Sequence, residues 1–161
     1  MPGTVGCGIV CVVQQATDGY RKCGCQPRTW EDLPVVEMTE DEFEQAVADA
    51  LDMVPDELMN ALDNVVFFIE DEPRPDMVHP DELDENGQAQ LLGLYEGTAL
   101  TDRDDGWAGA LPDTIFIFRG PLSRFCETRD ELIEEIAVTV IHEIAHHFGI
   151  DDDRLHDLGW G

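Results

Sequence analysis

The stretch TRDELIEEIAVTVIHEIAHHFG, residues 128–149, decides the fold of this chain. Thr128 can cap the N-terminus of a helix, and Glu131, three residues on, can reach back to complete a capping box. Apolar residues then recur from 132 to 148 and cover most of the helix circumference, which predicts a helix buried inside the domain. Gly149 is suited to end this helix, because glycine adopts the left-handed conformation of a C-cap.

Three polar residues within this apolar helix indicate chemistry. His142 and His146 are four residues apart, so a helix presents both imidazoles on one face, where they can bind one zinc ion. Glu143 is turned about 100° from His142, which places its carboxylate beside the ion. There it can take a proton from zinc-bound water. The H-E-x-x-H pattern therefore predicts a hydrolytic zinc site with His142 and His146 as ligands and Glu143 as the catalytic base.

The third metal ligand is expected after Gly149. A continuous helix would carry residue 152 about 15 Å along the axis from His142, so the chain must turn back at the glycine. Asp152 and His156 then compete for the third position. Imidazole is the more common zinc ligand, whereas a carboxylate helps to neutralise the dication. The residues alone leave this choice open.

The remaining histidines are not expected to bind the metal. His147 points away from His142 and His146 on a helix, so it is expected at the surface or behind the metal ligands. His79 lies in a proline-rich loop and is interpreted as structural.

The rest of the chain predicts an α+β fold. Thr39 and Glu42 form a second capping box, which begins a helix that must end before Pro55, and residues 55–62 can form a further short helix. Runs of β-branched and aromatic residues predict strands at 64–70, 91–96 and 114–120. We therefore expect a small twisted mixed sheet of three or four strands with a buried helix behind it.

The composition changes at Met38. Residues 1–37 hold four of the five cysteines but only four of the 36 acidic residues, whereas residues 38–161 contain no lysine. We predict a disordered N-terminal extension at 1–37 and one domain at 38–161. Cys126, the remaining cysteine, is interpreted as a small buried apolar residue.

The net charge of −27 restricts the partners of the protein. Such a field repels phosphate backbones and anionic lipid, so we expect neither nucleic acid nor a membrane as partner, and we expect cationic peptides to be favoured. No apolar run reaches the ~18 residues that span a bilayer, and the apolar N-terminal segment lacks a basic leader. The expected location is the cytoplasm. The sequence does not indicate an oligomeric state.

The C-terminal segment HEIAHHFGIDDDRLHDLGW, with LLGLYEG and FRGPL upstream, resembles the bacterial zincin-like metallopeptidase type 1 family. The resemblance runs from about Met38 to Gly161. It implies a minimal zincin-like domain that hydrolyses peptide bonds. In zincins the edge strand above the metal pairs with an extended peptide, and here Leu91 to Tyr95 would be that strand.

The longer H-E-x-x-H-x-x-G-x-x-H/D pattern of the metzincin peptidases assigns the ligands by resemblance. It implies His142, His146 and Asp152 as ligands, with Glu143 as the base, and so favours Asp152 over His156. One alternative is a metal-dependent hydrolase like the bacterial rRNA-maturation endoribonucleases, whose motif is similar in layout. Its phosphate contacts would be Arg119, Arg124, Arg129 and Arg154. The other alternative is a non-catalytic domain that zinc stabilises.

Overall fold

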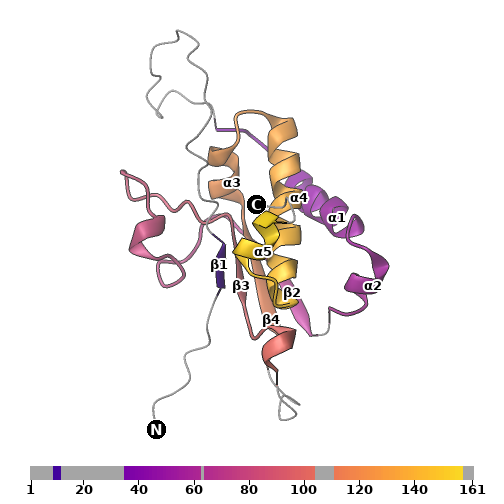
Figure 1. The fold of residues 1–161 in the computed structure, drawn as a ribbon. Coiled ribbons are helices and arrows are strands. Elements are labelled where there is room, and N and C mark those ends of the chain that lie inside the picture. Colours follow the sequence, from indigo (N-terminus) through magenta and orange to yellow (C-terminus); the bar gives the residue numbers. More distant parts are fainter. Residues whose placement is uncertain (1–8, 12–34, 63, 104–110, 158–161) are drawn as a thin grey trace.

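The computed structural model describes residues 9–11, 35–62, 64–103 and 111–157. Within these ranges the chain forms one mixed sheet with helices against it (Figure 1). The strands are β1 (Ile9–Cys11), β2 (Val65–Glu70), β3 (Gly93–Glu96) and β4 (Asp113–Phe118). Their order across the sheet is β1-β3-β4-β2, with β2 parallel to β4 and the other pairs antiparallel. The predicted α+β class with a small mixed sheet is confirmed.

Both predicted capping boxes are present. Thr39 Oγ1 accepts a hydrogen bond from the Glu42 backbone N–H at 3.3 Å and begins α1 (Glu40–Asp52). Thr128 Oγ1 accepts from the Glu131 backbone N–H at 3.2 Å and begins α4 (Arg129–His147). The short helix α2 (Asp56–Met59) follows Pro55. Among the described residues, no helix is long and apolar enough to cross a membrane.

The main core lies between the sheet and the helices α1 and α4, which pack against each other (Figure 1). Alternate residues of β4 point into this core, because successive strand side chains point to opposite faces of a sheet. The predicted burial of α4 is confirmed, since its apolar residues lie in the centre of this core. Its fully buried members include Phe43, Ile115, Ile117, Leu132, Ile136 and Val140.

A second, smaller cluster lies on the opposite face of the sheet. It is formed by residues of β3 and β4 together with the long connection between β2 and β3, and its members are Met77, Leu91, Leu94, Phe116 and Phe118. That connection contains the 3-10 turn η2 (Pro80–Glu82), for which the His79 ring accepts a capping hydrogen bond from the Asp81 backbone. The structural interpretation of His79 agrees with this contact.

Cys126 is a core residue, as its sequence context indicated. Its side chain is 7% exposed and belongs to the main cluster. Burial, assisted by the nearby acidic residues Glu135 and Glu131, raises the pKa of its thiol to about 12. Cys126 is therefore a packing residue rather than a nucleophile.

Two sequence predictions are corrected here. The strand expected at 114–120 stops at Phe118, and the helix α3 (Arg119–Phe125) follows it directly. Pro121 lies in the first turn of that helix, where its missing N–H has no partner to lose. In addition, residues 9–11 of the expected disordered extension form β1, which pairs with β3, so β3 is not an edge strand. Residues 1–8 and 12–34 of the extension lie outside the described residues.

Candidate functional site

Helix α4 brings His142 and His146 together. Their imidazole centroids are 4.8 Å apart and the rings meet edge to face at 69°. His142 is 7% exposed and His146 has no exposed surface. The spacing of four residues thus produces the shared face that the sequence predicted.

The ring of His146 is oriented by the backbone after the helix. Its Nδ1 atom lies 2.9 Å from the carbonyl oxygen of Ile150. A carbonyl can only accept, so Nδ1 carries the proton and donates it, and the lone pair of the ring then belongs to Nε2. This is the tautomer that a metal-binding histidine requires.

Gly149 ends α4 as predicted. It has φ +78°, and Ile150 N–H donates to the Ala145 carbonyl at 3.0 Å while Gly149 N–H donates to the His146 carbonyl at 3.0 Å. These two bonds form a Schellman motif, in which a left-handed residue satisfies the last helical carbonyls. Because Ile150 takes part in both this motif and the contact to His146, the helix end and the histidine ring are positioned together.

Glu143 lies between α4 and β3. Its side chain has no exposed surface. A Cβ atom placed on Gly93 would lie 2.8 Å from Glu143 Oε1 and 2.8 Å from Thr139 Cγ2, both closer than real Cβ atoms approach. A side chain at position 93 would therefore force Glu143 and Thr139 to shift away from β3.

His147 belongs to a buried polar cluster that the sequence did not reveal. Its side chain has no exposed surface and its Nδ1 lies 2.9 Å from Asp113 Oδ2, so the surface position considered for it is wrong. The same carboxylate accepts a hydrogen bond from the Tyr95 hydroxyl at 2.6 Å and pairs with Arg103. We call Tyr95, Arg103, Asp113 and His147 the Asp113 cluster. It ties the last turn of α4 to β3 and β4.

The Asp113 cluster keeps Tyr95 in its protonated form. Burial and then the hydrogen bond to Asp113 raise the pKa of the Tyr95 hydroxyl. A Cβ on Gly97 would lie 2.6 Å from Asp113 Oδ1 and 2.7 Å from the Tyr95 hydroxyl oxygen. The sequence signals for this cluster are Gly97, directly after β3, and Asp113, the first residue of β4. Because the two are 16 residues apart and follow no periodic pattern, the sequence alone does not connect them.

The candidates for the third ligand lie on the segment that returns after Gly149. The helix α5 (Asp152–Asp157) begins with Asp152 and includes His156. The side chains of both residues lie outside the described structure. Among the described side chains, no three histidine, cysteine, aspartate or glutamate residues form a group that could hold a metal. The choice between Asp152 and His156 stays a prediction.

A model of a family described as zincin-like metallopeptidase matches residues 62–160. This chain belongs to that family. The match includes α4, α5 and the Asp113 cluster, but it begins later than the resemblance that was expected from Met38. The strand β1 and the helix α1 lie outside it.

Comparison with solved structures found a similar chain described as a conserved hypothetical protein from Thermus thermophilus. The two chains share 21% identity with a TM-score of 0.43, over 75% of the zincin-like chain and 97% of the other. No curated protein matches the chain.

Membership of the zincin-like family implies a zinc ion and a metal-dependent peptidase. The residues of α4 fit such an ion, because two adjacent imidazoles are typical zinc ligands and His146 has the required tautomer. Glu143 follows His142 directly on the same helix.

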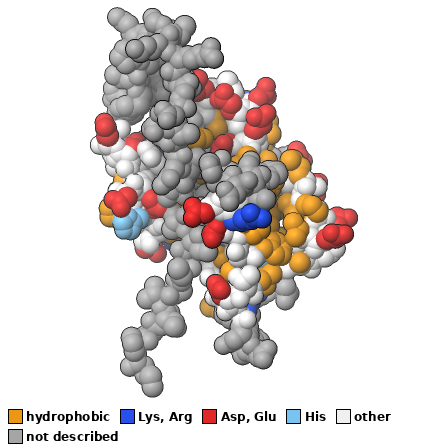
Figure 2. Space-filling view, viewed as in Figure 1, with side chains coloured by type: hydrophobic (Ala, Val, Ile, Leu, Met, Phe, Trp, Pro, Cys, Tyr) orange, Lys and Arg blue, Asp and Glu red, His pale blue; other side chains and the backbone are white. Residues whose placement is uncertain are grey.

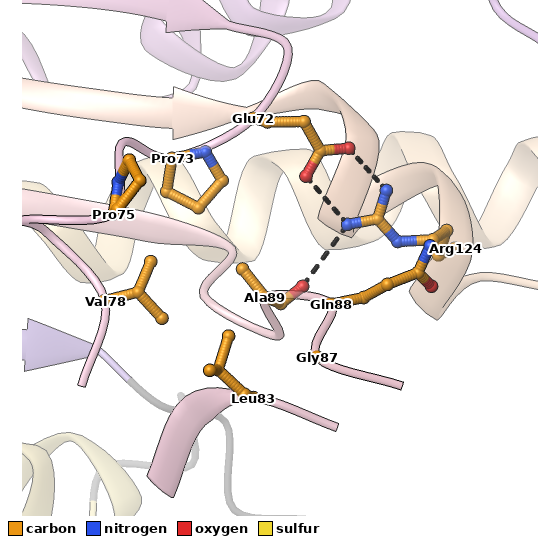
Figure 3. A pocket seen from close by; sticks show the side chains of 9 residues that line it. All are labelled: Glu72, Pro73, Pro75, Val78, Leu83, Gly87, Gln88, Ala89 and Arg124. Carbon is orange, nitrogen blue, oxygen red and sulfur yellow. Dashed lines mark hydrogen bonds and ion pairs between the residues drawn. The ribbon is translucent and has the colours of Figure 1, made fainter. Parts of the chain in front are cut away.

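A pocket elsewhere on the zincin-like domain is separate from these residues. It has a volume of about 450 Å³ and lies in the connection between β2 and β3, with Arg124 at one end (Figure 3). Arg124 donates hydrogen bonds to the carboxylate of Glu72 and, at 3.3 Å, to the carbonyl of Ala89 (Figure 3). None of the residues that line this pocket belongs to α4.

Proposed function

We propose that this protein is a zinc-dependent metallopeptidase in which His142, His146 and Asp152 hold the ion and Glu143 is the general base. The observation that carries the proposal is the hydrogen bond from His146 Nδ1 to the Ile150 carbonyl. It presents Nε2 of a buried histidine beside the ring of His142, 4.8 Å away between centroids. An imidazole that donates from Nδ1 and keeps its lone pair on Nε2 is in the form in which histidine binds zinc.

The metal and the base have distinct roles in this proposal. When bound, zinc supplies Lewis acidity that activates water and the substrate carbonyl. Glu143 accepts the proton that the attacking water loses and passes it to the leaving amine. Its burial between α4 and Gly93 holds the carboxylate in one place, so little ordering is needed during the reaction.

Asp152 remains the proposed third ligand and His156 the alternative. The described backbone supports a ligand on α5, because this helix starts three residues after the turn at Gly149. Asp152 is its first residue, directly beyond the turn. His156 lies four residues further along the same helix.

The proposed substrate is an extended peptide, with cationic residues favoured. On the face shown in Figure 2, acidic side chains are scattered and basic ones are sparse, in line with the net charge of −27. Glu135 lies seven residues before His142 and so on the same face of α4. Glu135 is half-buried, and burial raises the pKa of its carboxyl group. A lysine or arginine of the peptide would oppose that shift and pair with the carboxylate.

The nuclease alternative loses support from the ion pairs of the described arginines. Arg119 pairs with Asp71, Arg124 with Glu72 and Arg129 with Glu42. Three of the four arginines expected to contact phosphate are therefore already paired with carboxylates. An RNA ligand would have to compete with these partners as well as with the net charge of −27.

The variant Glu143→Gln tests the peptidase proposal. The amide keeps the shape of the side chain but cannot accept a proton, so zinc content should stay the same while peptide cleavage falls by about 100-fold or more. Zinc is measured by elemental mass spectrometry and cleavage by mass spectrometry on a peptide library. Glu134→Gln, an exposed change on the same helix, is the matched control.

Two outcomes would contradict the proposal. If Glu143→Gln cleaves peptides as fast as the natural protein, Glu143 is not the base. If neither protein cleaves any peptide while zinc raises the thermal midpoint, the alternative of a non-catalytic, zinc-stabilised domain is favoured.

A further inference from the structure

The outer edge of β3 is occupied by the chain's own strand β1. The two strands are antiparallel, with Ile9 opposite Tyr95, Val10 opposite Leu94 and Cys11 opposite Gly93 (Figure 1). The inner edge of β3 pairs with β4, so β3 has a strand on each side. An extended peptide could add to β3 only at the position that β1 fills.

The register places β1 next to the proposed catalytic residues. Gly93, opposite Cys11, is the residue whose absent side chain leaves room for Glu143 and Thr139. Directly opposite residues in an antiparallel pair have their Cα atoms about 4.5–5.5 Å apart. The strand β1 also lies close to α4 itself. It therefore lies next to the Gly93 backbone that packs against Glu143, and it contacts α4 as well as β3.

The proposed active-site residues are closed off in this arrangement. Glu143 and His146 have no exposed surface, and His142 is only 7% exposed. A hydrolase must admit both water and a peptide to its base. In the described conformation these three side chains are therefore not accessible to a peptide.

The occupant lies outside the part of the chain that defines the family. The family match begins at residue 62, whereas β1 ends at Cys11. Strand addition relies mainly on backbone hydrogen bonds, which any extended segment can make. β1, which lies outside the family match, can thus pair with the edge of β3, which lies inside it.

We propose that β1 is an internal competitor that occupies the peptide-binding edge of β3, and that its release opens this edge to an extended peptide in antiparallel orientation. The proposal rests on the proposed peptidase function for the nature of the ligand. It goes further in stating that the full chain is self-inhibited.

A proline variant in the full chain tests this inference. In the double variant Ile9→Pro/Val10→Pro, neither residue can donate a backbone N–H to β3, so β1 should detach. The control is Gln14→Pro/Gln15→Pro, which makes the same change beyond the strand. The probe is a fluorescently labelled synthetic peptide of residues 5–15, VGCGIVCVVQQ, kept reduced, with a scrambled peptide as its control.

Binding is measured by fluorescence anisotropy, which does not depend on catalysis. The peptide should bind the double variant at least about tenfold more tightly than the natural protein, because a site that is open a tenth of the time loses that factor in apparent affinity. The scrambled peptide should bind both proteins equally weakly, and the Gln14/Gln15 variant should behave as the natural protein. Equal binding of the 5–15 peptide to all three proteins would overturn the proposal.

Cleavage assays on the same proteins separate this inference from the proposed function. If the double variant gains peptide binding but no protein cleaves any peptide, the inference is supported and the peptidase function fails. If the natural protein and the double variant cleave peptides at the same rate, the function is supported and the inference fails.

Discussion

The two halves of α4 are stabilised in different ways. The N-terminal half, residues 129–138, is partly exposed. Its first turn is capped by the adjacent Thr128, and Leu132 and Ile136 pack its apolar side into the main core. The C-terminal half, residues 139–147, is almost entirely buried although it contains three histidines and a glutamate.

The buried half depends on residues that are distant in sequence. His147 contacts Asp113, 34 residues earlier, and Glu143 packs against Gly93. Burying polar groups is unfavourable unless they gain partners, so these contacts decide whether this half folds at all. The comparison teaches that one helix can combine a locally determined start with an end that depends on tertiary contacts. Changes in the C-terminal half should therefore have the larger effects.

The largest expected effect is the loss of zinc on changing His146 to alanine. Zinc binding to a complete structural site is worth about 10–16 kcal/mol, and removing one of three protein ligands should abolish stoichiometric binding at neutral pH. The comparison variant is His147→Ala, which removes the neighbouring ring but no proposed ligand. It should weaken zinc binding by no more than about 10–100-fold. Competition with a chelator of known affinity measures both, and equal losses would place His147 among the ligands.

The second-largest expected effect is a loss of stability when the Asp113 cluster is disrupted. Asp113 is 3% exposed and pairs with Arg103, so Asp113→Ala removes the carboxylate that neutralises a largely buried cation. Such changes lower the free energy of unfolding by about 3–5 kcal/mol. Asp113→Asn keeps an acceptor for Tyr95 and should lose less. Chemical denaturation of the zinc-free proteins measures this, and a loss below about 1 kcal/mol for the alanine variant would show that the cluster is not an anchor.

The choice of the third ligand can be decided by Asp152→Ala and His156→Ala, measured separately. Removing a direct ligand should weaken zinc binding by more than the roughly 10–100-fold expected for a supporting residue. We expect Asp152→Ala to have the larger effect. If His156→Ala is the more damaging variant, His156 is the ligand and the assignment must be reversed.

The smallest effect is expected in the N-terminal half. Thr128→Ala removes the hydroxyl that caps α4 and should lower the free energy of unfolding by about 1 kcal/mol. Zinc affinity should stay the same, because the cap is far along the helix from His142. Thr39→Ala, the same change on α1, is the matched control. A clear loss of zinc affinity in Thr128→Ala would show that the two halves are coupled more tightly than the contacts indicate.

The same division explains how much the sequence could predict. Caps, periodicity and the glycine stop are local, so α1, α4 and the turn at Gly149 were predicted from their own residues. The facing pair His142 and His146 follows equally from helix geometry. The buried contact of His147 with Asp113 was not predicted. Asp113 lies on β4, and only the tertiary fold, including the pairing of β3 with β4, brings it near the end of α4. The occupied edge of β3 was also missed, since β1 comes from a segment whose composition suggested disorder.

The backbone of Ile150 connects the end of α4 to the proposed ligand His146. Its N–H closes the last turn and its carbonyl orients the imidazole, so the side chain of residue 150 contributes to neither contact. A substitution at 150 therefore keeps both contacts if the peptide plane keeps its orientation. Gly149 has no such freedom, because its φ of +78° sets that plane and a Cβ there would collide with Thr101. Two adjacent positions thus differ in what they require, because Gly149 is restricted by its own geometry whereas Ile150 makes both contacts through its backbone.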